Sequence, residues 1–180
     1  MRPPSSCELP PAFYLLPLPP ANCQLPTANC QLKNYYLRKM QFDPENKIVK
    51  LCADGMAAEG LGHEDEAMDL FTRAWNESST DFEKFTSAHF VARHQKTVTE
   101  KLIWDETALD HALKIRDGSL NHSLPSLLLN IGKCHEDLNN FELARSYYLR
   151  AHSYINFLPD DGYGKMIKSG IVAGIARLNQ

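Results

Sequence analysis

Apolar residues recur along the chain at intervals of three and four, the spacing that places side chains on one face of an α-helix. In residues 144–158, Ala144, Tyr148, Ala151, Ile155 and Leu158 follow steps of four, three, four and three. No segment alternates apolar and polar residues with a period of two, so the pattern predicts no β-sheet. We expect an all-α fold with helices near residues 44–60, 64–77, 82–95, 98–116, 125–138, 141–157 and 163–178.

Local polar signals predict where some of these helices begin. Asp43 precedes Pro44, and proline is tolerated at the first helical position. Two capping boxes, each a threonine followed three residues later by a glutamate, predict helix starts in the middle of the chain. They are Thr80 with Glu83 and Thr97 with Glu100.

Two segments share one pattern of small and aromatic residues at identical offsets. In each copy a glycine is followed after twelve residues by an alanine, then by an aromatic residue and a second alanine at steps of four and three. The first copy has Gly55, Ala67, Phe71 and Ala74, and the second has Gly132, Ala144, Tyr148 and Ala151. Small residues let two antiparallel helices approach closely, and the aromatic ring fills the gap beside them. These eight residues are therefore predicted as the repeat-packing positions.

The distance between the copies leaves room for a third, degenerate helix pair at residues 80–118. Its two helices are expected to bury Phe82, Phe85, Ala88 and Ala92, and Leu102, Trp104, Ala108, Leu109 and Ala112. The last predicted helix presents Met166, Ile167, Ile171, Ile175 and Leu178 on one side. That apolar side suits a helix that caps the stack. The sequence thus predicts an array of about seven helices, three pairs plus a C-terminal cap helix.

With these offsets the chain resembles the tetratricopeptide repeat family. The resemblance implies that the first helix of each pair lines a concave groove that binds a peptide or protein. Carried over, the groove positions are Val49, Cys52, Met56, Glu59 and Gly60 in the first copy, and Ser126, Leu129, Lys133, Glu136 and Asp137 in the second. The Lys and Asn clamp of the chaperone-binding members is absent. A partner with an apolar anchor and some basic character would suit this mixed apolar and acidic groove.

Three runs, at residues 42–44, 84–95 and 158–166, also resemble small stand-alone bacterial proteins of this kind. Some of those proteins carry a label as ribosomal RNA adenine methyltransferases, so a small enzyme or RNA-associated factor is the alternative function. The sequence shows neither the strand, Gly-rich loop and helix of such a cofactor site nor an Asn/Asp-Pro-Pro-aromatic motif. We therefore expect a non-catalytic protein-interaction module that needs no cofactor.

Composition changes sharply near Met40. Eight of the eleven prolines lie in residues 1–39, and proline at this density interrupts helices and central strands. The same stretch contains a tandem seven-residue repeat at 19–25 and 26–32. We expect residues 1–39 to be a disordered tail upstream of a start at Met40, and residues 40–180 to form the helical domain. A signal-peptide interpretation has only the short apolar stretch 12–18 to support it.

The overall composition limits the partners. The chain has 180 residues and a formal net charge of −3, whereas proteins that coat nucleic acids are strongly basic. No apolar run reaches the roughly 20 residues of a membrane span. Nothing besides the cysteine count suggests an oxidising compartment, so a cytoplasmic location is predicted. The expected partner is a protein or peptide, with self-association through the exposed end of the stack as a further option.

Candidate chemistry is sparse. No two of the seven histidines have the spacing of four residues that directs both rings at one metal from one helix. The only local basic cluster is Arg93, His94, Lys96 and Lys101, at the bend inside the middle pair. It is either a solvated corner or a corner that binds a carboxylate or phosphate, since an arginine engages such anions bidentately.

Overall fold

The computed structural model describes residues 43 and 45–179, and every regular element within them is helical. In chain order the elements are α2 (Lys47–Gly60), α3 (Glu64–Glu77), α4 (Asp81–Arg93), α5 (Val98–Ala112), α6 (Leu124–Asp137), α7 (Phe141–Ser153), the 3₁₀-helix η2 (Ile155–Phe157) and α8 (Gly162–Arg177). The all-α prediction is confirmed for this part of the chain. The predicted tail, residues 1–39, lies outside the described residues.

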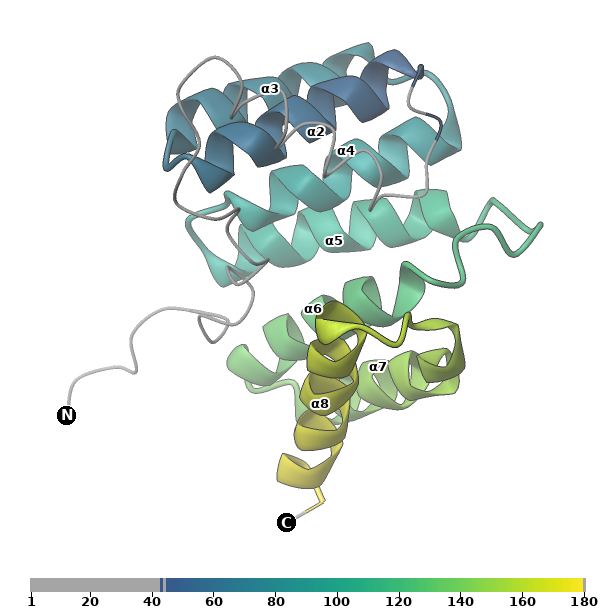
Figure 1. The fold of residues 1–180 in the computed structure, drawn as a ribbon. Coiled ribbons are helices and arrows are strands. Elements are labelled where there is room, and N and C mark those ends of the chain that lie inside the picture. The colour runs from purple at the N-terminus through teal and green to yellow at the C-terminus, as the bar shows by residue number, and fades with distance from the viewer. Residues whose placement is uncertain (1–42, 44, 180) are drawn as a thin grey trace, which may run out of the picture.

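The helices stack as an array of antiparallel pairs, α2 with α3, α4 with α5 and α6 with α7 (Figure 1). The first pair is followed by α4, which contacts both α2 and α3. In the same way α8 contacts both α6 and α7, so it covers the last pair as a cap helix. The junction between the second and third pairs differs, because α6 packs there chiefly against α5.

Helix ends follow the local capping chemistry. Both capping boxes form, with Thr80 accepting from the backbone N–H of Glu83 and Thr97 from that of Glu100. The first described helix starts later than the expected residue 44. Its cap is Asn46, whose side chain accepts hydrogen bonds from the backbone N–H groups of two residues in the first turn. An asparagine cap satisfies amide groups that have no partner inside the helix.

Helix α5 is shorter than predicted and ends at Ala112 instead of residue 116. Beyond it, the backbone N–H groups of Lys114 and Ile115 donate to carbonyl groups three residues earlier, the tighter pattern of a helix terminus. Gly118 lies in the following turn with φ +78°, and Leu120 returns to the core, where it is buried. Gly118 therefore belongs to the loop between α5 and α6, and helix α5 ends before it.

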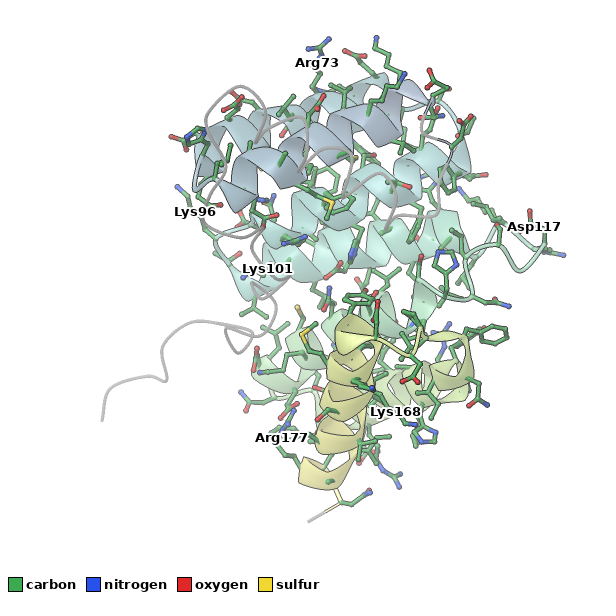
Figure 2. All side chains as sticks on the ribbon, viewed as in Figure 1. Arg73, Lys96, Lys101, Asp117, Lys168 and Arg177 are labelled. Carbon is green, nitrogen blue, oxygen red and sulfur yellow. The ribbon has the colours of Figure 1, made fainter. Side chains whose placement is uncertain are left out.

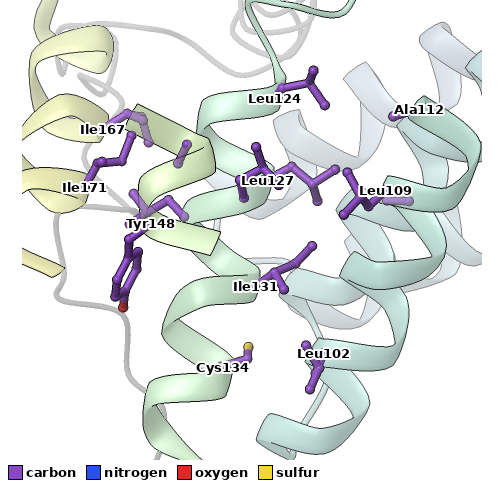
Figure 3. Close-up of a cluster of buried hydrophobic side chains, with 14 of the residues drawn as sticks. Leu102, Leu109, Ala112, Leu124, Leu127, Ile131, Cys134, Tyr148, Ile167 and Ile171 are labelled. Atoms are coloured by element: carbon purple, nitrogen blue, oxygen red, sulfur yellow. The ribbon is translucent and has the colours of Figure 1, made fainter. Parts of the chain in front are cut away.

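Two clusters of buried hydrophobic side chains hold the array together. The first joins α2 and α3 to Phe90 and Val91 of α4. The second, part of which Figure 3 shows, extends from Phe85 and Ala88 on the other side of α4 through α5, α6 and α7 to α8. Trp75 and Trp104 are partly buried and pack against both clusters. They stand where the two cores meet.

Candidate functional site

The repeat-packing residues bring the two helices of each outer pair into close contact. A Cβ atom on Gly55 would lie within 2.8 Å of three Phe71 ring atoms, and one on Gly132 within 2.7 Å of two Tyr148 ring atoms. The four alanines of the pattern, Ala67, Ala74, Ala144 and Ala151, are fully buried. These distances leave no room for a side chain at either glycine.

Tyr148 is held from a second side by the cap helix. A Cβ atom on Gly174 of α8 would lie 2.7 Å from Cε2 and Cζ of the Tyr148 ring. The hydroxyl group of Tyr148 donates to Glu136, which also accepts two hydrogen bonds from the Arg177 guanidinium, at 2.7 and 2.8 Å. The hydrogen bonds from Arg177 hold the pKa of Glu136 below its usual range. One aromatic ring thus locks α6, α7 and α8 together.

The first-copy groove positions do not form an open surface. Val49 and Cys52 are fully buried and Met56 is 9% exposed. Burial raises the pKa of the Cys52 thiol well above its usual range, so the sulfur stays protonated and is a poor nucleophile. Glu59 accepts a 2.7 Å hydrogen bond from Arg93 of α4. These side chains stabilise the fold instead of facing a partner.

The second-copy groove positions are taken up by internal contacts, several of them with α8. Leu129 is 6% exposed, and its Cδ2 would lie 3.0 Å from a Cβ atom on Gly170 of α8. Ser126 is buried as well. Lys133 and Asp137 form an ion pair along α6, and Glu136 binds Arg177 near the end of α8 (Figure 2). The chain's own cap helix therefore covers the groove face of the last pair.

The basic cluster does not meet as an open anion site. Arg93 is paired with Glu59, and His94 Nδ1 lies 3.4 Å from Glu64. Burial lowers the pKa of His94, so its ring is neutral at pH 7. Lys96 and Lys101 lie on the side of the molecule where α4 turns into α5 (Figure 2). Two of the four predicted residues thus already face carboxylates of the chain itself.

A buried carboxylate stands between α4 and α5. Asp105 is 3% exposed, and its Oδ1 lies 3.5 Å from Nδ1 of His89. Desolvation raises the pKa of Asp105 above its usual range, against the opposing effect of His89. Asp105 therefore sits inside the helix packing, and His89 is its partly exposed neighbour.

A half-open hollow of about 330 Å³ lies between α3, α4 and α5. We call it the two-tryptophan pocket. Its walls are Met68, Thr72, Trp75 and Asn76 of α3, Val91 of α4, Gln95 after α4, and Trp104 of α5. The Trp75 and Trp104 rings meet edge to face, with centroids 5.0 Å apart and an interplanar angle of 89°. These are the only two tryptophans of the chain.

Sequence reasoning did not identify this pocket. Trp104 was expected in the core of the middle pair, but the structure leaves it partly exposed at the pocket wall. Trp75 directly follows the packing residue Ala74, so it points away from the repeat-packing stripe of α3. The signal available in the sequence was that Trp75 stands one residue after Ala74 and therefore outside the buried stripe of α3.

Nowhere in residues 43 and 45–179 do three His, Cys, Asp or Glu side chains gather closely enough to hold a metal ion. None of the helices in that part of the chain combines the length and the hydrophobicity needed to cross a bilayer.

Comparisons with known proteins give no match: no family model fits the chain, and no curated protein or solved structure is significantly similar to it.

Proposed function

We propose that the chain is a non-catalytic protein-interaction module whose contact site is the two-tryptophan pocket. The pocket carries the proposal because it is a hollow of about 330 Å³ walled by two partly exposed tryptophans and a methionine. Tryptophan and methionine are enriched at protein interfaces, and tryptophans are frequent among the residues that contribute most binding energy. The array around the pocket supplies a rigid frame, because α3, α4 and α5 are held by both hydrophobic cores.

This proposal keeps the function expected from the repeat pattern but moves the site. The first-helix face, where the resemblance placed the groove, is buried or engaged in internal ion pairs at most of the predicted positions. The pocket instead opens between the second helices of the first two pairs, α3 and α5, with α4 as its floor. Thr72 and Asn76 are exposed at its rim and can bind the backbone of a partner.

Site-specific photo-crosslinking tests the proposal. A photoreactive phenylalanine analogue replaces Asp69, an exposed residue of α3 one turn before Thr72 that does not line the pocket, or, as the control, His152 on the exposed side of α7. The proposal expects a discrete crosslinked protein from native lysate at position 69 that is absent at position 152. That protein is then purified, and its affinity for the unmodified chain must fall in a Thr72→Phe variant. Equal crosslinking at both positions, or unchanged affinity in the variant, would refute the proposed site.

A further inference from the structure

We infer that the two-tryptophan pocket accepts an uncharged aromatic side chain, phenylalanine or tyrosine, from the partner. This inference rests on the proposed function and specifies the ligand chemistry of the same site. It follows from the shape of the tryptophan pair, the charges around the pocket and the polar groups at its rim.

The shape of the tryptophan pair favours a flat ring. Trp75 and Trp104 stand nearly perpendicular to each other, so they present a ring face and a ring edge at right angles. Aromatic rings prefer edge-to-face or offset stacked contacts with centroids about 4.5–7 Å apart, and a corner of this kind offers both to a third ring. Val91, which is buried, closes the bottom of the pocket, and Met68 adds a flexible wall. The volume of about 330 Å³ exceeds that of a single phenyl ring and leaves room for adjacent main-chain atoms.

The residues that line the pocket favour an uncharged occupant. None of the seven lining residues is ionisable, and a buried charge without a partner is strongly unfavourable. A cation already lies over the Trp75 ring. Lys84 Nζ lies 4.0 Å from the Trp75 ring centroid and donates a 3.0 Å hydrogen bond to the Trp75 carbonyl oxygen. A second ammonium or guanidinium group at this ring would be repelled.

The rim supplies hydrogen bonds for the atoms that flank the ring. Thr72 and Asn76 are exposed on one side of the opening, and both can donate and accept. Gln95, on the other side, is held in place by a 3.0 Å hydrogen bond from its Nε2 to the carbonyl oxygen of Val91. An apolar centre surrounded by neutral polar groups is the usual composition of a site that binds one anchoring side chain.

The intrinsic fluorescence of the full chain measures occupancy directly, because both of its tryptophans line the pocket. The probe is N-acetyl-L-phenylalaninamide, which does not absorb at the red edge of the indole band. Titration should give a saturable change in emission. The cyclohexylalanine analogue should bind several-fold more weakly, since it has the volume but not the aromatic ring, and the lysine analogue should give no saturable change.

Variants at the rim separate pocket binding from contact elsewhere. Thr72→Phe and Asn76→Phe each place a ring of the chain's own at the opening and should abolish the saturable response while the helical circular dichroism is retained. Asp69→Phe adds the same ring to α3 one turn earlier at a position that does not line the pocket, and should bind the probe like wild type. A phenylalanine probe that fails to saturate, or that binds the two rim variants as well as wild type, overturns the inference.

The two proposals fail in different ways. If a crosslinked partner needs the pocket but the phenylalanine probe does not bind, the ligand chemistry is refuted and the interaction module stands. If neither the partner nor the probe responds to substitution at the rim, both are refuted.

Discussion

The substitution Gly132→Ala tests whether the Tyr148 ring, which is enclosed between α6 and α8, stabilises the packing of α6, α7 and α8. The added Cβ atom would lie 2.7 Å from Cδ1 and Cε1 of Tyr148 and 3.4 Å from the carbonyl oxygen of Ala144. The ring cannot retreat, because Gly174 of α8 is equally close on another side and the hydroxyl group is bound to Glu136.

The expected magnitude follows from two opposing contributions. Overpacking a tight core costs about 1–3 kcal/mol, and a ring held from two sides belongs at the upper end of that range. Replacing glycine by alanine inside a helix recovers about 1 kcal/mol of helix propensity. We therefore expect Gly132→Ala to lower the free energy of unfolding by about 2 kcal/mol, and Gly132→Leu to lower it by more.

Denaturant unfolding of the full chain, followed by circular dichroism, measures this change as a lower midpoint with an unchanged slope. Gly170→Ala is the matched control, because its Cβ atom would meet only Cδ2 of Leu129, at 3.0 Å, and a methyl group at the end of a side chain can rotate away. Because the same gain in helix propensity applies inside α8, its stability should equal that of wild type or exceed it by up to about 1 kcal/mol. In a Tyr148→Leu background, which removes the ring, the penalty of Gly132→Ala should disappear. A Gly132→Ala protein as stable as wild type would refute the packing argument.

Three further predictions concern charge and ligands. Glu136→Gln should cost about 1–2 kcal/mol, because it weakens charge-assisted hydrogen bonds that are partly solvent-screened. The pKa of Glu136 is lowered in the folded state, so the stability that its ionised carboxylate contributes is present above pH 4.5 and lost as the pH falls through the lower, folded pKa. The difference in stability between the variant and the wild type should therefore shrink on acidification. Asp105→Asn should be at least as stable as wild type at pH 7 in denaturant unfolding. Burial raises the pKa of Asp105, so the wild type should gain stability as the pH falls through that raised pKa toward 3.8. The variant should lack this gain. A clearly lower stability of the variant at pH 7 would show that the carboxylate is needed beside His89. S-adenosylmethionine should leave the melting temperature unchanged, whereas a concentration-dependent rise would support the enzyme alternative.

The helices and their closest contacts were accessible from the sequence because they depend on local spacing. The steps of four and three that define the stripe from Ala144 to Ala151 are fixed by helix geometry alone. The glycine and aromatic residue of each copy meet because two helices joined by a short turn must pack antiparallel. The turn residues Gly62 and Asn139, both with positive φ, occupy matching places in the two copies.

The sequence did not predict that α8 covers the groove face of the last pair. Leu129 and Glu136 lie on the face that the repeat pattern assigns to a partner, and the sequence does not show that Gly170 and Arg177 of α8 reach them. That contact depends on how the chain returns after η2, which no local spacing specifies. The two-tryptophan pocket depends on three helices from separate segments, so it too emerges only when they are assembled.

The division between the two hydrophobic cores has a consequence for synthesis. It runs through α4, with Phe90 and Val91 in the first core and Phe85 and Ala88 in the second. Domains fold from the N-terminus as the chain leaves the ribosome, so all the fully buried residues of the first core are present once Val91 has emerged. The second core waits for Ile171, close to the other end of the chain. Until α5 has emerged and paired with α4, α4 is packed on one side while Phe85 on its other side is exposed to the surroundings of the nascent chain.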